Sequence, residues 1–594
     1  MANFLAIVSK NVDEKEALVA NAASAMSPFP GMVRVRKDVG DCTMVWCVSP
    51  CAPVSWSEND RWASLLIGEA IVADGDRRAD AAEVAQAWSE DGSQVQGWDG
   101  FHAAVVFDKK RQNLSMGSDC IGSFPAYFLD LSDSVVVASS PEILAKHPRA
   151  DLSMDLQGFA GILHTCGLVG ERTLCTGIRR LVPRKVFVQD SSGRRSRLDQ
   201  AEFAWDPEIS RKWGARSHDD QIAILAEASA KLARRHFRSD RPVGQLLSGG
   251  LDSRMIAGYA RECGLSPKTV TFGSPYEVES RISRFVADRL GWEHRIVHEP
   301  YGDYAELGGR MASAEHLSAG FAFSFGPLVS NPGGLSASGE RMLTGLQLDY
   351  IASGIYIPSA RPDLFNLGFL PDTMRKLLPA GPFRDAYETM LEEGKSRWRE
   401  YPGEDYQKIL IRDLDYRGRH HVGINLWRLS FGSWPVTMSL DREYISVCRA
   451  LPDATTRDRR AQKDLVTGRF PDLASLPLDD NSIKWSYLPG VPNDRWVDFK
   501  LRMNRKWNTW MGREMRYYYN AYNLEAEHWG KIRELAEPGR DALGSLFVRS
   551  EFDRLLAPPG RSIELDGEDG ITGSASRKVL LGAMILAQRL PLSG

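Results

Sequence analysis

A glycine-rich hexamer, Ser-Gly-Gly-Leu-Asp-Ser at 248–253, constrains the fold of this chain more than any other feature. An apolar strand is expected before it, at 243–247, and an amphipathic helix after it, at 252–263. A second strand at 268–273, a further helical segment and a third strand at 293–299 follow. Strands that alternate with helices in this way predict a parallel sheet with helices on its faces. Ligands of such sheets bind at the carboxyl ends of the strands, where the hexamer lies.

The residue types of the hexamer suit a phosphate group. Gly249 and Gly250 allow a sharp turn and a close approach of the backbone to an anion. Ser248, Ser253 and the free amides at the helix start can donate hydrogen bonds to phosphate oxygens. The hexamer lacks the Gly-Lys-Ser/Thr of a Walker-type loop. The alternative is a plain turn before a helix capped by Asp252 or Ser253, since both are good N-cap residues.

The hexamer resembles the ATP-pyrophosphatase loop of asparagine synthetases and their relatives. The resemblance implies ATP and Mg²⁺ as ligands: the loop would grip the β,γ-pyrophosphate, and its aspartate would help to hold the metal. The residues that would take these roles are Ser248, Gly249, Gly250, Asp252 and Ser253.

A second segment, Leu-Thr-Gly-Leu-Gln-Leu-Asp at 343–349, resembles the LTGEGADE segment of the same family. The resemblance makes Asp349 a second metal ligand and a candidate catalytic residue, and it places Gly345 beside the nucleotide. Leu346 replaces the glutamate of the family segment. Taken alone, Asp349 would be interpreted as a solvated loop residue or a helix cap, but the pairing with the hexamer favours the metal role.

Two further segments match the family in order along the chain. Thr271, Phe272 and Gly273 lie where the second strand of the family meets the adenine. The segment at 435–452 resembles the PFLDRE…LP segment, and its Asp441 is expected to have a structural role.

Lys484, in Asn-Ser-Ile-Lys-Trp at 481–485, resembles the family's lysine that meets the acyl-adenylate. An ammonium there would stabilise negative charge on the carbonyl and on the departing AMP. The alternative is a surface lysine whose stem packs beside Trp485. His420 and His421 are alternative candidates for assisting the amine, although histidines of the core or the surface are more common.

The N-terminal part resembles the family's glutaminase domain through residues 100–128. The resemblance implies the sandwich of N-terminal-nucleophile hydrolases for 1–205. It also implies an ATP-pyrophosphatase-type parallel α/β synthetase domain with a helical C-terminal part for 206–594, so the expected class is α/β plus α+β. The glutaminase needs a cysteine directly after the initiator methionine, and this chain has Ala2 there. Its substrate-holding Asn-Gly-Glu is Ile-Gly-Glu at 67–69, so we expect this domain to be degenerate and inactive.

The missing nucleophile narrows the function that the resemblance implies. Relatives without it include β-lactam and carbapenam synthetases and lasso-peptide cyclases, which adenylate a carboxylate and let an amine of the same substrate close a ring. The β-lactam type has a tyrosine at the position of Leu346, and leucine cannot replace it in proton transfer.

The resemblance therefore favours a lasso-peptide cyclase, which joins an Asp or Glu side chain to the N-terminal amine of a leader-cleaved precursor peptide and releases AMP and pyrophosphate. Its partners would be that precursor peptide, a leader peptidase and a leader-recognition protein. The alternatives are an asparagine synthetase-like or β-lactam synthetase-like ligase of small molecules, and a pseudoenzyme scaffold.

The composition argues against a protein that binds nucleic acid or a membrane. The 594 residues carry a net charge of −3, which predicts no association with nucleic acid or with a membrane. Eight scattered cysteines suit a reducing compartment, so a cytoplasmic location is expected. Residues 495–522 mix basic and aromatic side chains, but an amphipathic helix with a solvated basic face accounts for them without nucleic acid. A groove that contacts a peptide or a partner is the alternative for this segment. The apolar residues at helical spacing are Trp507, Met511, Met515, Tyr518 and Tyr522.

Overall fold

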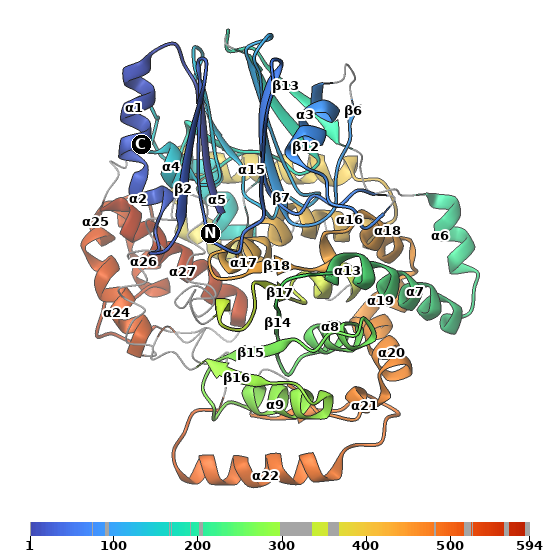
Figure 1. The fold of residues 1–594 in the computed structure, drawn as a ribbon. Helices are drawn as coiled ribbons and strands as arrows, with labels where there is room; N and C mark the ends of the chain where they lie inside the picture. The colour runs from blue at the N-terminus through green and yellow to red at the C-terminus, as the bar shows by residue number, and fades with distance from the viewer. Residues whose placement is uncertain are drawn as a thin grey trace.

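The structure is a computed structural model (Figure 1). It describes residues 2–73, 75–89, 94–165, 167, 169–190, 192–200, 206–297, 335–353, 368–479, 483–515, 524, 527–563 and 570–588. Within these ranges, no helix is both long enough and apolar enough to cross a membrane.

Two sheets form the N-terminal part. The six-stranded sheet runs in the order β11 (Ile178–Arg180), β9 (Tyr127–Leu129), β10 (Val135–Ala138), β1 (Ala2–Val8), β3 (Cys42–Val48) and β2 (Val33–Val39). The seven-stranded sheet runs in the order β4 (Val54–Glu58), β5 (Trp62–Gly68), β7 (His102–Asp108), β8 (Asn113–Ser118), β12 (Lys185–Asp190), β13 (Arg195–Gln200) and β6 (Gln94–Val95). The strand β1 pairs antiparallel with both β3 and β10.

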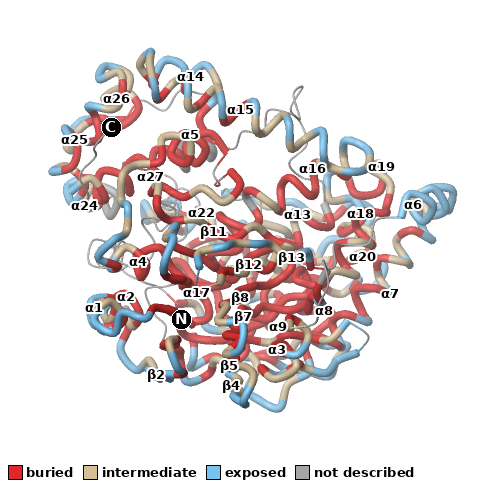
Figure 2. Tube along the Cα trace, turned by 90° about the horizontal axis from the view of Figure 1, so that it is seen from above, coloured by how far each residue is buried: buried red, intermediate tan, exposed pale blue. Residues whose placement is uncertain are grey.

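These sheets stack with helices on their outer faces, because alternate residues of a strand point to opposite sides. Phe4 of β1 and Leu65 of β5 share the core between the sheets. Leu5 belongs instead to the cluster formed with α1 (Val12–Asn21), and Leu66 to the cluster formed with α3 (Ala81–Ser89). Figure 2 shows the strands as largely buried. The layers are those of the expected sandwich.

A five-stranded parallel sheet follows, in the order β16 (His294–Val297), β15 (Lys268–Phe272), β14 (Val243–Leu246), β17 (Arg341–Leu343) and β18 (Trp434–Val436). The helices α8 (Leu251–Glu262) and α9 (Val278–Leu290) connect β14 to β15 and β15 to β16. The strand order reverses at β14, since β15 and β16 extend to one side and β17 and β18 to the other. The predicted alternation of strands and helices is therefore present, and it creates a switch point where parallel sheets bind ligands.

The rest of the described chain is mainly helical. Its elements include α6 (Pro207–Gly214), α7 (His218–Phe237), α13 (Leu348–Ser353), α15 (Pro382–Glu400), η3 (Leu414–Val422, a π-helix), α18 (Arg442–Ala450), η5 (Arg457–Arg459), α20 (Arg460–Arg469), β19 (Leu478–Asp479), β20 (Trp485–Ser486), α22 (Arg495–Trp510) and α27 (Gly570–Ala587). The domain boundary at 205/206 stays a prediction; α6, just after it, lies exposed at the edge of the molecule (Figure 2).

The interpretation of residues 495–522 needs a correction. The helix α22 ends at Trp510, and residues 516–523 lie outside the described part. Trp507 and Met511 were expected on the buried side, but they are 56% and 44% exposed. The buried side consists of Val497, Leu501 and Asn508. Helical spacing shows which residues share a face, but it does not show which face meets the rest of the protein.

Candidate nucleotide-binding site

The hexamer lies directly after β14 and forms a loop closed by its own serines. The Ser248 and Ser253 Oγ atoms are 2.9 Å apart, and the backbone amides of Ser248 and Gly250 each donate to one of these hydroxyls at 3.1 Å. The N-cap of α8 is Gly250, and no side chain caps this end. The alternative of a turn capped by Asp252 or Ser253 is therefore wrong. An uncapped helix start behind two glycines is a suitable place for an anion.

Two glycines permit the close packing of the loops. A Cβ atom at Gly249 would lie 2.8 Å from the Cβ of Asp479. A Cβ atom at Gly345 would lie 2.8 Å from the Cβ of Asp252 and 2.9 Å from its carbonyl carbon. The loops after β14 and β17 therefore touch through backbone, at the switch point where parallel sheets bind ligands.

Asp252 is half-buried and fixed by two donors. Arg459 Nη2 and Gln462 Nε2 donate to its Oδ1 at 2.5 and 2.8 Å. Asp349 lies half-buried on α13, which packs against η5 and α20, the elements that carry these donors. The structure therefore brings the segments of both predicted metal ligands against the same neighbours.

The donor set of this site fits Mg²⁺. Among the described residues, both hydrogen bonds to Asp252 fall on Oδ1 and none on Oδ2. No group of three or more His, Cys, Asp or Glu side chains in the described ranges could hold a metal by itself. Mg²⁺ commonly uses one or two carboxylates together with the phosphates of a substrate, so two aspartates beside a phosphate loop suffice.

The strand β15 supports the hexamer loop from the side of β14 opposite to β17. The Thr271 hydroxyl donates to the Leu247 carbonyl, and its oxygen lies 2.8 Å from Ser283 Oγ, so it ties β15 to the start of the loop. Phe272 is buried. Gly273 has a φ of +139°, and a Cβ there would lie 2.2 Å from a carboxylate oxygen of Glu277. These contacts give Thr271 and Gly273 structural roles at the site; contact with adenine stays a prediction.

Arg254, on the first turns of α8, was missed by the sequence analysis. Its buried guanidinium donates to the carbonyls of Gly249, Leu473, Leu476 and Pro477 at 3.3, 3.0, 2.8 and 2.6 Å. Burial lowers the pKa of Arg254 to about 9. These four bonds clamp the segment before β19 onto the hexamer. No local sequence pattern could have revealed the bonds to Leu473, Leu476 and Pro477, because these three carbonyls lie more than two hundred residues away in the sequence.

Lys484 precedes β20, and its hairpin partner β19 touches the hexamer, since the Asp479 amide donates to the Gly249 carbonyl at 3.2 Å. Lys484 itself is exposed and lines a cavity of about 740 Å³ together with Trp485, Arg502 and Arg505. The hairpin is thus anchored at the hexamer loop, while the Lys484 side chain opens toward α22. Its catalytic role stays a prediction.

Carboxyl groups gather beside the loop. Burial first, and then the nearby charges of Asp479 and Glu277, raise the pKa of Glu279 well above its usual range. Gly249 packs against Asp479, and Gly273 packs against Glu277. Sequence reasoning missed this group because its members come from α9, its N-cap and β19.

Gln347 links the segment at 343–349 to two distant elements. It has a φ of +73°, and its Nε2 donates to Ser123 Oγ at 3.0 Å and to the Gly418 carbonyl at 3.1 Å. The neighbouring Leu346 is half-buried, and its carbonyl accepts from Ser439 Oγ at 3.0 Å. The segment that follows Gly345 is therefore fixed by contacts with the N-terminal part and with η3.

Of the two histidine candidates, His420 does not fit the role of a base. His420 is 1% exposed, its Nδ1 lies 2.6 Å from Arg180 Nη1, and Arg419 Nε donates to its Nε2 at 3.2 Å. Two guanidinium groups thus surround His420, which makes it a core residue rather than a base for an incoming amine. The side chain of His421 lies outside the described part. Asp441 has the expected structural role: it caps α18 through the Glu443 amide and accepts from His236 Nε2 at 2.8 Å.

Comparison with known proteins finds similarity to asparagine synthetases and their relatives. The asparagine synthase family matches residues 225–317, and the glutamine amidotransferase domain family matches residues 75–198. Asparagine synthetase [glutamine-hydrolyzing] 3 of Bacillus subtilis (strain 168) is 29% identical over 32% of this chain and 30% of its own length. Carboxyethyl-arginine beta-lactam-synthase of Streptomyces clavuligerus is 25% identical over 45% of this chain and 48% of its own length.

The chain thus spans about a third to a half of the length of these relatives. Among solved structures, the allosteric regulatory enzyme of purine biosynthesis aligns with 10% identity over 50% of this chain and 80% of that chain. Its TM-score of 0.24 is too low to support a conclusion. The coarse class is therefore an asparagine synthase-like chain with an amidotransferase-like N-terminal part.

Proposed function

We propose that this protein is an ATP-dependent ligase that adenylates a carboxylate and then forms an amide. The observation that carries the proposal is the packing of the hexamer at 248–253 against Gly345 at the switch point of the parallel sheet. A substrate carboxylate would attack the α-phosphorus of ATP, which gives acyl-AMP and pyrophosphate. An amine would then attack the acyl carbon, lose a proton and expel AMP.

The chain's own residues supply binding and orientation. The amides behind Gly249 and Gly250 and the hydroxyls of Ser248 and Ser253 would hold the pyrophosphate, and Asp252 and Asp349 would hold Mg²⁺. The metal, when bound, neutralises phosphate charge. The hydrogen bonds from Arg459 and Gln462 would keep the Asp252 carboxylate in place before a substrate binds.

The source of the amine is the next step of the proposal. Ala2 is fully buried at the start of β1, and the indole of Trp427 donates to its carbonyl at 3.2 Å. The nearest described thiol on the sheet is Cys47, which pairs in register with Asn3, and burial raises its pKa to about 11. Such a thiol is not a nucleophile at neutral pH. We infer that this part releases no ammonia from glutamine.

The most specific part of the proposal is the class of substrate. An amine within the substrate removes the need for ammonia, and Leu346 stands where the β-lactam type has its tyrosine. An α-amine titrates near neutral pH and needs little activation. We therefore favour macrolactam formation on a leader-cleaved precursor peptide, as in lasso-peptide cyclases. A leader peptidase and a leader-recognition protein would supply this peptide, and Lys484 would stabilise the acyl step.

A second candidate is a ligase acting on a small molecule. The match to the beta-lactam-synthase, which covers more of this chain than the match to the asparagine synthetase, favours it. Cyclisation of a small substrate would also dispense with glutamine.

The test is ATP–pyrophosphate exchange with a candidate peptide and, separately, with small amino-acid carboxylates, followed by mass spectrometry of the products. Peptide-dependent exchange and a product lighter by one water would support the cyclase. Exchange with small carboxylates alone would transfer support to the second candidate, and no exchange with any carboxylate would contradict the ligase.

The variant Lys484→Ala should slow cyclisation about a hundredfold, the scale for loss of one preorganised charge, while ATP still binds. Lys268→Ala is the matched control, because Lys268 is exposed and paired with Glu293 at the start of β15. Equal rates in both variants would exclude Lys484 from the acyl step.

A further inference from the structure

The helix α22 presents a row of large apolar side chains to solvent. We call it the aromatic stripe: Trp496, Phe499, Met503, Trp507 and Trp510, which are 62, 54, 52, 56 and 74% exposed. Their spacings of three and four residues put them on one side of the helix. Exposed apolar residues usually occur singly, so five on one helical face call for a binding partner.

The opposite side fixes α22 to the protein. Val497 and Leu501 are buried in the main core, and Asn508 is fully buried. Asp494 caps the helix through the amides of Trp496 and Val497 at 3.1 and 3.0 Å and accepts from Arg289 at 2.6 Å. The stripe is therefore the outer face of a well-anchored helix.

Basic residues flank the stripe. On a helical wheel Lys500 lies on one side of it and Lys506 on the other, and Arg495 and Arg502 lie beyond Lys506. All four are exposed. The one acidic residue of the helix, Asp498, accepts from Arg502 at 2.7 Å and from the Trp485 indole at 2.9 Å, toward the protein side. The outer half of α22 is thus apolar in the middle and positive at its borders.

We propose that α22 docks on an anionic lipid surface, with its axis parallel to the membrane plane. An apolar face with Trp and Phe between Lys and Arg borders is the pattern of interfacial helices, and the positive borders complement anionic headgroups. Figure 1 shows α22 at one end of the molecule, beyond α9, where a flat surface can reach it. The expectation of no membrane contact came from the net charge of −3, which averages over the whole chain and hides this local patch.

Two other occupants fit less well. Lysine is depleted at protein–protein interfaces, whereas here lysines border both sides of the stripe. Single-stranded nucleic acid needs open ring faces for base stacking. Here Trp496 and Phe499 stack on each other with centroids 5.9 Å apart, Trp507 and Trp510 lie 5.1 Å apart, and Lys500 covers the Trp496 ring at 4.9 Å. Rings engaged in this way offer edges and apolar surface, which suit a lipid interface.

The test is co-sedimentation of the full chain with vesicles of phosphatidylcholine alone and of phosphatidylcholine mixed equally with phosphatidylglycerol. The chain should bind the anionic vesicles at low salt and bind them more weakly as salt screens the charges. The triple variant Trp496→Ser, Trp507→Ser and Trp510→Ser should bind about tenfold or more weakly. Its thermal unfolding should stay unchanged, because these side chains are exposed.

The matched control is Ile209→Ser, Leu370→Ser and Leu535→Ser, three exposed apolar residues elsewhere, which should bind like the wild type. A second variant, Lys500→Gln with Lys506→Gln, should lose several-fold in affinity and much of the salt dependence. The proposal is overturned if the wild type ignores anionic vesicles or if the triple variant binds equally well. It is also overturned if the stripe instead drives self-association of the chain without lipid.

Discussion

Substitution of Gly345 by alanine tests whether the contact between the two loops creates the nucleotide site. The new methyl group would lie 2.8 Å from the Cβ of Asp252, 2.9 Å from its carbonyl carbon and 3.1 Å from the amide nitrogen of Ser253. Carbon atoms in favourable contact are about 3.5–4.0 Å apart, so the loops must separate by roughly 0.7 Å. Two of the three atoms belong to the backbone of α8 and cannot rotate away.

Overpacking of this kind costs about 1–3 kcal/mol. A shift of about 1 Å between binding groups can cost about a hundredfold in activity. We expect Gly345→Ala to lower the urea midpoint and to weaken the stabilisation that Mg²⁺-ATP gives against thermal unfolding. The rate of ATP–pyrophosphate exchange should fall by more than the loss of stability alone would cause, because the displaced segment carries Asp349.

The matched control is Gly394→Ala on α15, where a Cβ atom meets nothing within 4 Å. Alanine in place of glycine within a helix should stabilise the protein by about 0.5–1 kcal/mol. The stabilisation that Mg²⁺-ATP gives against thermal unfolding should not change. If Gly345→Ala keeps the wild-type protection by Mg²⁺-ATP, the two loops do not form one site.

Three further outcomes are expected. Asp252→Asn and Asp349→Asn should each remove most ATP–pyrophosphate exchange while the protein stays folded, because an amide is a poor Mg²⁺ ligand; near-normal exchange would place the metal elsewhere. Incubation with glutamine and ATP should release no glutamate above background because Ala2 carries no thiol, and clear release would restore an ammonia-producing role. Burial lowers the pKa of His102 to about 4 from 6.5, so the unfolded state takes up more protons below pH 6.5 and stability falls on acidification. His102 should contribute about 2 kcal/mol to that loss between pH 7 and 5, and the urea midpoint of His102→Gln should depend less on pH than that of the wild type.

The parallel sheet and the hexamer loop could be predicted from the sequence. The features that specify them, which are glycines, strand length and helical periodicity, lie within a few neighbouring residues. The predicted helix at 252–263 forms as Leu251–Glu262, and its Met255 and Ile256 are buried.

Contacts between distant segments were not predictable. The roles of Arg254 and Gln347 depend on carbonyls and hydroxyls brought near by the fold. The prediction of which side of α22 is buried was wrong for the same reason. Trp507 and Leu501 are both apolar, and only the packed structure decides which of the two is buried.

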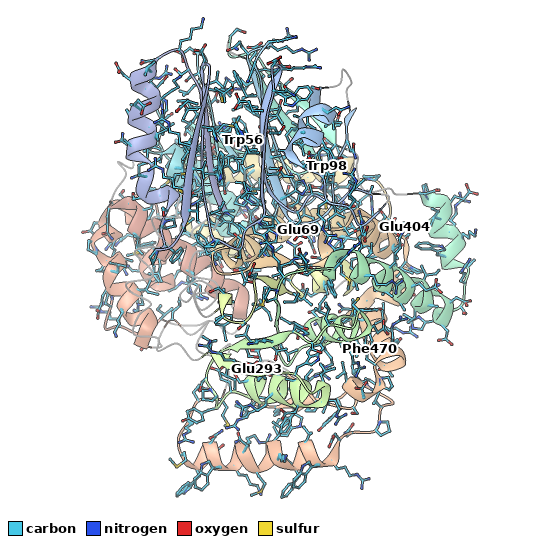
Figure 3. All side chains as sticks on the ribbon, viewed as in Figure 1. Trp56, Glu69, Trp98, Glu293, Glu404 and Phe470 are labelled. Atoms are coloured by element: carbon cyan, nitrogen blue, oxygen red, sulfur yellow. The ribbon has the colours of Figure 1, made fainter. Side chains whose placement is uncertain are left out.

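The N-terminal part has a structural use that does not depend on glutamine. Glu69, in the segment that resembles the substrate-holding motif, accepts from Arg341 on β17 at 2.6 Å, and Figure 3 shows it between the N-terminal sheets and the parallel sheet. Nearby, the buried Asp99 accepts from Arg235 at 2.8 Å and from Arg442 at 2.9 Å, across the same junction. Removing one member of such a buried pair costs about 3–5 kcal/mol, because the other charge is left without compensation. Deleting the N-terminal part would leave Arg341, Arg235 and Arg442 without these partners, so the rest of the chain would lose stability even if no ammonia is ever made.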